Sequence, residues 1–306
     1  MSERVICIVG ATASGKSAVA DQVAASLGSS VISIDAMQVY RGMDIGTAKT
    51  PAGERRAPLL MVDVCEVTDD YSVQLFQRDA RACADGLLES GLTPVLCGGT
   101  GLYLDAVIDE MTFPSGSRNG DRREHYELLA RELGAQGLWE LLRGRDEASA
   151  AIIHPNNERR VVRALEMLDE GVSYAAHHDG LLRRSPHYDA TIWGLSWDRE
   201  TLYARIDARV DAMFEQGLVG EVERLVDNGL ARDSTAGQAI GYKEVMDALE
   251  GRCGMDEARG QVKARSRRYA KRQLSWLRRD GRVRWIDMAG TGPERACELV
   301  LAGMGT

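Results

Sequence analysis

Hydrophobic residues in the first third of the chain form short β-branched runs separated by amphipathic stretches. Helical spacing follows the first run from residue 18, and a second helix is expected at about residues 73–89. Strands that alternate with helices predict an α/β fold with a parallel sheet covered on both faces. Four runs predict strands, the last entering a glycine turn: residues 4–10 (RVICIVG), 31–34 (VISI), 58–64 (PLLMVDV) and 93–101 (TPVLCGGTG).

The pattern changes after residue 111. A loop is predicted at residues 113–121, charged helical sequence continues to about residue 171, and residues 173–188 are expected to be irregular. We therefore predict an α/β core of residues 1–111 and 189–306, interrupted by a helical insertion domain at residues 112–188. The second part of that core should hold a strand at 189–197, helices at about 199–228, 236–249 and 256–280, a strand at 282–288 and a short final helix.

Composition narrows the class of protein. The chain has 306 residues, 44% of them hydrophobic and 27% charged, which is typical of a globular protein with one large domain or one domain and a smaller one. The apolar runs are too short to cross a bilayer, so no membrane association is expected. Six scattered cysteines without a C-x-x-C pair predict reduced thiols and a cytoplasmic setting.

Charge is unevenly distributed. The net charge is −8, but residues 259–284, which we call the basic segment, contain eleven Lys and Arg and one acid, Asp280. This segment is therefore +10 and the rest of the chain −18. A basic stripe on an acidic protein confines a polyanion to one place. The alternative is a solvated helix face held by ion pairs, although the near absence of acids within the stretch predicts poor local pairing.

A phosphate-binding loop (P-loop) follows the first strand. The sequence GATASGKS matches G-x-x-x-x-G-K-[ST] between a strand and a helix. Backbone amides of such a loop bind anions at a helix N-terminus. Lys16 adds a positive charge and Ser17 can ligate Mg²⁺. The predicted phosphate-binding residues are Gly10, Ala11, Thr12, Ala13, Ser14, Gly15, Lys16 and Ser17.

The P-loop does not say which phosphate is bound. A nucleotide hydrolase should place a Mg²⁺-binding aspartate after a strand, and both Asp35 and Asp63 qualify. No N-K-x-D motif for a GTPase is present, and no glutamate to activate water is identifiable. A small-molecule P-loop kinase therefore remains open. From the residues alone, Asp35 is equally a Mg²⁺ ligand, a strand-end cap or a general base.

Several longer blocks resemble the tRNA dimethylallyltransferases (tRNA isopentenyltransferases). They come in the order of that family, from residue 9 to residue 276. Three positions depart from the usual pattern: Ala11 stands where proline is common, Ala36 where serine is common, and Leu60-Met61 where a histidine pair is common. The blocks are GATASGKS, DAMQVYRGMDIGTAK, VLCGGTGLYLDAVI, RRVVRALEM, LYARIDARVDAMFEQG, AIGYKE and RSRRYAKRQLSW.

The resemblance implies a P-loop NTPase-like core and transfer of a dimethylallyl group from dimethylallyl diphosphate to N6 of the adenosine 3′ of the anticodon. Asp35 would then accept the proton of N6, and the P-loop would hold the diphosphate, where ATP could compete. Arg209 would contact the phosphates, unless it pairs with Asp207 or Asp211. Thr100 would touch the target nucleotide, as would the segment of Asp35, Ala36, Met37 and Gln38.

The same resemblance implies contacts with the tRNA anticodon stem-loop away from the P-loop and Asp35. Arg159, Arg160 and Arg163 open a predicted helix, where they would bind phosphate or pair with Glu158 and Glu166. Arg123 in the insertion, and Lys271 and Arg272 in the basic segment, are further candidates. We expect a monomer that uses Mg²⁺.

Two rival functions stay open beside the kinase. An isopentenyltransferase acting on free AMP, ADP or ATP would share the P-loop and Asp35, but it would need neither the basic segment nor the insertion. A non-catalytic RNA-binding protein with a relic P-loop would not need Lys16, Ser17, Asp35 and Thr100 together.

Overall fold

The computed structural model describes residues 4–113, 120–182 and 184–304. The chain divides into two compact units. The core unit contains the residues up to 108 and those from 186 onward, and the helical unit spans Asp109–Ser185. The helical unit overlaps the predicted insertion at residues 112–188.

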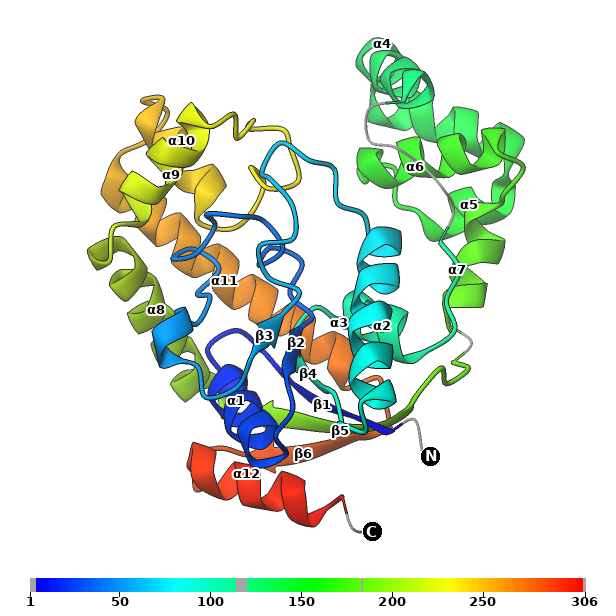
Figure 1. Cartoon of the computed structure of the whole chain (residues 1–306). Helices are drawn as coiled ribbons and strands as arrows, with labels where there is room; N and C mark the ends of the chain where they lie inside the picture. Colours follow the sequence, from blue (N-terminus) through cyan, green and yellow to red (C-terminus); the bar gives the residue numbers. More distant parts are fainter. Residues whose placement is uncertain (1–3, 114–119, 183, 305–306) are drawn as a thin grey trace. The chain divides into compact units, whose positions relative to one another are not determined.

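All strands of the core unit lie in one six-stranded sheet, and every pairing in it is parallel (Figure 1). The strand order is β3-β2-β4-β1-β5-β6. This confirms the predicted α/β fold with a parallel sheet. The strands are β1 (Arg4–Gly10), β2 (Val31–Ser33), β3 (Leu59–Leu60), β4 (Val95–Gly98), β5 (Asp189–Ser196) and β6 (Val283–Asp287).

Each face of the sheet is covered by helices because successive side chains of a strand point to opposite faces. Ile6 and Ile8 of β1 pack into the cluster that includes α1 (Lys16–Ser26) and α12 (Pro293–Ala302). The alternate residues Val5, Cys7 and Val9 belong to the larger cluster on the other face. Helices α2 (Val73–Glu89), α3 (Gly101–Ile108) and α11 (Met255–Leu277) pack on that second face.

The register of the sheet brings three loops together. Val9 pairs with Gly98, and Ser33 pairs with Cys97, so β1, β2 and β4 end at one edge of the sheet. The P-loop leaves β1 there, Asp35 follows β2, and the glycine turn before α3 follows β4. Ligands of open α/β sheets bind in the crevice beyond this carboxyl edge.

Some elements differ from those predicted. The run at 58–64 forms only a two-residue strand, because Met61 and Asp63 adopt positive φ angles of 60° and 55° that end the pairing. Helix α3 was not expected. The helical stretch at 199–228 is divided at Gly217, whose φ is 98°, into α8 (Arg199–Glu215) and α9 (Leu218–Asp227). Helix α10 (Tyr242–Leu249) starts later than the predicted residue 236.

The helical unit has its own small core. Leu138, Leu142, Val161 and Leu165 are fully buried there. The prediction that residues 173–188 are irregular is wrong for residues 174–182, which form α7. Its first turn is fixed from α5, where Ser149 Oγ accepts a hydrogen bond of 3.0 Å from the amide of Ala175. The helices are α4 (Asp121–Arg145), α5 (Glu147–Ile152), α6 (Glu158–Asp169) and α7 (Tyr174–Leu182).

The six cysteines are free thiols, as predicted. Within the part of the chain that the structure describes, no helix combines the length and apolar character needed to span a bilayer.

Candidate active site

The P-loop has the backbone conformation of an anion-binding loop. Ala13 and Gly15 have positive φ angles of 62° and 92°, and α1 begins immediately after, at Lys16. Gly10 is needed at its position because a Cβ there would lie 2.7 Å from Ser14 Oγ. The loop thus turns tightly onto the N-terminus of a helix, where backbone amides and the helix dipole favour negative charge.

Side chains from distant parts of the core unit hold this loop in place. The Trp197 indole N–H donates to the Ser14 carbonyl at 3.0 Å, and Arg205 Nε donates to the Ala13 carbonyl at 2.9 Å. The Thr12 amide donates to Gln273 Oε1 at 2.9 Å. These bonds fix the loop before any ligand arrives, so anion binding requires little reorganisation.

Two cations face the cavity beside the P-loop. Burial lowers the pKa of Lys16, whose Nζ lies 3.2 Å from the Ala11 carbonyl, and the nearby charge of Arg209 lowers it further. Burial also lowers the pKa of Arg209, with Asp35 opposing that shift. Arg209 Nε is buried and has no hydrogen-bond partner among the described residues. A buried, unpaired guanidinium nitrogen beside a lysine is an arrangement that can bind an anion.

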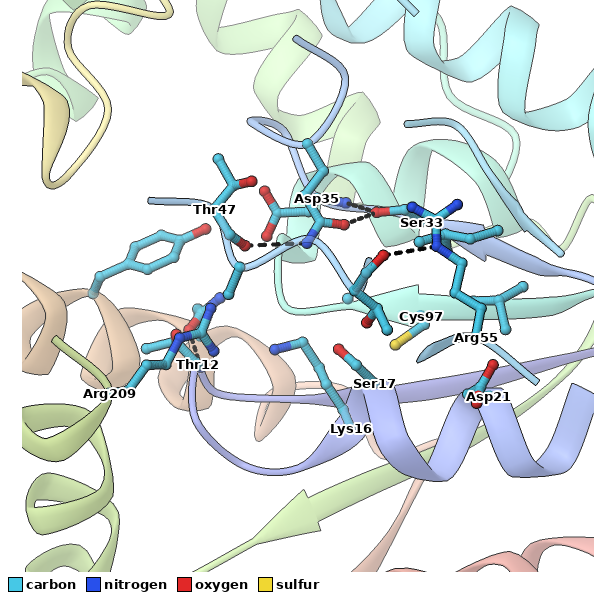
Figure 2. Close-up of a pocket in the computed structure, with 18 residues that line it drawn as sticks. Thr12, Lys16, Ser17, Asp21, Ser33, Asp35, Thr47, Arg55, Cys97 and Arg209 are labelled. Carbon is cyan, nitrogen blue, oxygen red and sulfur yellow. Dashed lines mark hydrogen bonds between the residues drawn. The ribbon is translucent and has the colours of Figure 1, made fainter. Parts of the chain in front are cut away.

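Asp35 lines the same cavity from the end of β2 (Figure 2). Its Oδ1 accepts a hydrogen bond of 2.9 Å from the amide of Met37, so the residue does cap the turn after the strand. The capping alternative therefore holds for one oxygen. It does not exclude a chemical role, because each carboxylate oxygen has two lone pairs.

Cys97, on β4, lines the cavity as well. Burial raises its pKa to about 11, with partial opposition from Lys16 and from a hydrogen bond to Ser17. The raised pKa favours the neutral thiol, which is a poor nucleophile.

Gln38 is engaged within the protein at both ends of its amide. Its Oε1 accepts from Ser33 Oγ at 2.7 Å, and its Nε2 donates to the Thr47 carbonyl at 3.1 Å (Figure 2). If Gln38 paired with a base edge, as predicted, its amide would give up these two hydrogen bonds and form new ones with the base. Ala36 and Met37 line a neighbouring hollow together with Asp35.

Glu221, on α9, anchors the loop after Asp35 and was not identified from the sequence. Its side chain is 3% exposed and accepts hydrogen bonds from the amides of Asp44, Ile45 and Gly46, at 3.1, 2.7 and 3.2 Å. The Tyr242 hydroxyl donates to it at 2.6 Å. The sequence feature that could have identified Glu221 is its place on the same helix face as the apolar residues Leu218 and Val222, where a buried carboxylate is expected to have hydrogen-bond partners.

Lys49 fixes the far end of the same loop. Its buried Nζ lies 2.6 Å from the Tyr40 carbonyl, 2.9 Å from Asp44 Oδ1 and 2.6 Å from Asp63 Oδ1. Asp63, one of the two candidate Mg²⁺ ligands, therefore pairs with a lysine. Asp35 is the remaining strand-end acid that lines the cavity.

Replacing Glu221 with alanine should destabilise the core unit by about 3 kcal/mol, because three amides and a buried hydroxyl lose a charged acceptor. Urea unfolding measures the change. The exposed Glu223, two residues along the same helix, is the matched control, and its replacement with alanine should change stability by less than about 0.5 kcal/mol. Equal losses for the two variants would contradict the anchoring role.

The central cavity meets two further hollows. One lies along the P-loop and α8 and includes Lys16, Ser17 and Arg209. The other is bounded by α10 and α11 and includes Asp35, Arg209, Tyr269 and Arg272. Arg209 lines all three. Two reactants could thus reach the cations and Asp35 from different sides.

Thr100 lies in the glycine turn after β4. Its Oγ1 is 3.3 Å from the hydroxyl of Tyr269, which lines the central cavity. Burial raises the pKa of Tyr269, so this hydroxyl stays protonated and available as a donor.

The basic segment is better paired than predicted. Lys263 binds Asp211 at 2.7 Å and Arg267 binds Asp207 at 2.6 Å, because α8 presents acids to α11. Arg265 pairs with Glu244, and Arg282 pairs with Asp280. A second group is exposed and forms no salt bridge with the described residues: Arg268, Lys271, Arg272, Arg278 and Arg279.

The arginines of the helical unit also divide into two groups. Arg123 and Arg163 flank the buried Glu166, with closest approaches of 3.9 and 3.7 Å, and burial raises the pKa of that carboxyl. The ion-pair alternative thus accounts for Arg163. Arg159 and Arg160 are exposed at the start of α6.

Comparisons with known proteins agree on one family. The family model described as IPP transferase matches residues 38–280, and the one described as isopentenyl transferase matches residues 3–56. The tRNA dimethylallyltransferase of Carboxydothermus hydrogenoformans is 42% identical over 307 residues, which cover 100% of this chain and 98% of that protein. That of Corynebacterium efficiens is 42% identical over 96% of this chain and 98% of the relative.

Solved structures give the same result. The full-length tRNA isopentenylpyrophosphate transferase from Bacillus halodurans is 40% identical, with a TM-score of 0.74 over 99% of this chain and 96% of that one. A eukaryotic dimethylallyltransferase acting on tRNA shares the fold with a TM-score of 0.81 at 24% identity, over 99% of this chain and 80% of that one.

Proposed function

The chain belongs to the IPP transferase family, and on that basis we propose that it transfers a dimethylallyl group from dimethylallyl diphosphate to N6 of the adenosine 3′ of the anticodon in tRNA. The observation that carries the proposal is the cavity in which Lys16 and Arg209 face Asp35 beside the P-loop. It combines a site for a multiply charged anionic leaving group with a proton acceptor.

The P-loop amides and Lys16 would bind the diphosphate of the donor. As N6 attacks the allylic carbon, the C–O bond to diphosphate breaks and its electrons pass to the leaving oxygen. Lys16 and Arg209 stabilise this charge, because preorganised cations act most strongly where charge develops. The N6 proton passes to Asp35, which gives a neutral secondary amine on the base.

We propose Mg²⁺ as the cofactor. Ser17 places a hydroxyl at the start of α1 beside the cavity, and Mg²⁺ characteristically binds through one or two protein ligands plus substrate phosphates and water. Among the described residues, no three His, Cys, Asp or Glu are grouped to hold a metal ion, which fits a metal that arrives with the diphosphate. Bound there, Mg²⁺ would neutralise charge on the diphosphate.

The adenosine would enter from the hollow bounded by α10 and α11. A stacked anticodon-loop base must be turned out to reach the half-buried Asp35 carboxylate, at a cost of a few kcal/mol. Asp35, Thr100 and Tyr269 would surround the extruded base, with the segment of Ala36, Met37 and Gln38 at its edge. The exposed Lys271 and Arg272, with Arg159 and Arg160 of the helical unit, would bind tRNA phosphates. Arg123 and Arg163 would support those contacts through Glu166.

The substrate also fits a cytoplasmic setting, since tRNA and reduced thiols are found together there. We propose that the protein acts as a monomer, because the cavity is formed by residues of one chain.

Incubating the protein with donor labelled in the allyl group tests this function. Label should move to tRNA, one diphosphate should be released per label, and tRNA carrying guanosine at the target position should stay unlabelled. ATP should compete for the P-loop without being hydrolysed. Transfer to free AMP but not tRNA would establish the free-nucleotide alternative. Transfer of the terminal phosphate of ATP to an acceptor would establish a kinase, and release of that phosphate coupled to product would establish an ATPase.

A further inference from the structure

Trp276 is an exposed aromatic residue whose ring is nevertheless held in place. It lies near the end of α11 and is 39% exposed. Its indole N–H donates at 3.0 Å to Oδ2 of Asp105, a residue of α3 that is 8% exposed. A surface indole with a buried carboxylate partner has lost most of its rotational freedom before any ligand binds.

The glycine turn after β4 provides the surface beneath this ring. A Cβ added to Gly101 would lie only 2.1 Å from Trp276 Cδ1 and 2.4 Å from Cγ. The five-membered part of the indole therefore packs directly on the backbone of residue 101. This turn is the one that carries Thr100, so Trp276 is built against the edge of the proposed nucleotide site.

The helix geometry connects Trp276 to the cavity. Tyr269, Gln273 and Trp276 are spaced four and three residues apart, which places them on one side of α11. Tyr269 and Gln273 line the cavity, and Trp276 lies about 10 Å beyond Tyr269 along the helix axis. A nucleotide beside an extruded adenosine would pass this position.

The charges next to Trp276 favour a polyanion. Arg268, Arg272 and Trp276 follow one another at four-residue intervals, so they project from a common side of the helix. Both arginines are exposed, and neither forms a salt bridge with the described residues. The Arg272 guanidinium carbon lies over the Tyr269 ring, 5.5 Å from its centroid, so this cation is held beside the cavity. Proteins bind unpaired nucleotides with an immobilised aromatic ring beside exposed cations. The ring stacks on the base, and the cations contact the backbone.

We propose that Trp276 is a stacking platform for an unpaired base adjacent to the target adenosine in the anticodon loop. The proposal rests on the proposed function, since it takes tRNA as the substrate. Stacking there would stabilise the loop with its adenosine turned out, because the neighbouring base exchanges its former stacking partner for the indole.

Binding of anticodon stem-loop RNA to four proteins tests the platform: wild type, Trp276→Ala, Trp276→Phe and Trp285→Ala. Trp285, on β6, is 38% exposed and is the matched control for loss of a surface tryptophan. Trp276→Ala should weaken binding roughly 5- to 150-fold, the range for loss of one base–aromatic stack. Trp276→Phe should keep most of the affinity, and Trp285→Ala should match wild type.

RNAs lacking the base on one or the other side of the adenosine complete the experiment. One of these two RNAs should bind wild-type protein only as tightly as the complete RNA binds Trp276→Ala. The same RNA should show no further loss of affinity for Trp276→Ala. If the loss of affinity from the missing base added to the loss from Trp276→Ala, the platform would be overturned. Wild-type affinity that neither abasic site lowers would also overturn it, and this result does not require the alanine variant to fold. Unchanged donor affinity in Trp276→Ala confirms an intact P-loop. Wild-type protein that binds none of the RNAs would instead overturn the proposed function.

Discussion

Replacing Asp35 with asparagine is expected to lower the turnover of allyl transfer about 10²–10⁴-fold, the usual contribution of general acid–base catalysis. Asparagine keeps an oxygen that can accept the 2.9 Å bond from the Met37 amide, so the turn after β2 should survive. It cannot accept a proton. Affinity for dimethylallyl diphosphate should be nearly unchanged, because the P-loop is untouched.

Comparison with Asp35→Ala separates the chemical role from the capping role. Both variants lose the proton acceptor, but only alanine also loses the cap. Single-turnover rates with saturating tRNA and donor should therefore be low for both, with alanine at or below asparagine. Asparagine with wild-type turnover would show that Asp35 only shapes the turn.

Replacing Arg209 with alanine is expected to lower turnover about 10²–10³-fold, the typical cost of removing one preorganised donor at a developing charge. Its buried Nε lacks a partner within the described residues, so the guanidinium is poised for the diphosphate and for charge that builds as the C–O bond breaks. The loss should appear mainly in turnover, with a smaller loss in donor affinity, since Lys16 and the P-loop remain.

Arg199 is the matched control for Arg209. It is an exposed arginine in the first turn of the same helix, stacked over Tyr203 with 5.2 Å between its guanidinium carbon and the ring centroid. Arg199→Ala should leave turnover within about twofold of wild type, as expected for a surface change of less than 0.5 kcal/mol. Similar losses for Arg199 and Arg209 would contradict a direct role of Arg209 at the leaving group.

Features encoded by nearby residues could be predicted from the sequence. The runs at 4–10 and 189–197 become β1 and β5 because each combines a β-branched stretch with burial on both faces of a parallel sheet. The P-loop could be predicted because eight consecutive residues define it. Asp35 could be predicted as a site residue because it directly follows a strand. The register of β1, β2 and β4 then brings these local features to one edge.

Features that depend on partners far along the chain could not be predicted in this way. Glu221 binds amides about 175 positions earlier, and Lys49 and Asp63 meet only after the loop between them folds. The basic segment has few acids of its own, yet α8 supplies Asp207 and Asp211 to it. The first turn of helix α7 similarly depends on a hydrogen bond that the Ala175 amide donates to Ser149 Oγ of α5. Local pattern carries no information about such pairings.

The structure also separates two roles that the sequence combined in one arginine cluster. Arg123 and Arg163 have a buried carboxylate between them, so their positions are fixed within the helical unit. Arg159 and Arg160 are exposed and free of that constraint. A contact with tRNA phosphate is therefore expected first from the exposed pair.

The central claim is that this chain places an allyl group on N6 of the adenosine 3′ of the anticodon. Mass spectrometry of tRNA nucleosides from cells lacking the gene tests it most directly. We predict that adenosine bearing the five-carbon allyl group, together with its further-modified forms, disappears from the tRNA, returns with the wild-type gene and does not return with Asp35→Asn. The same nucleosides at undiminished levels in the deletion strain would contradict the account.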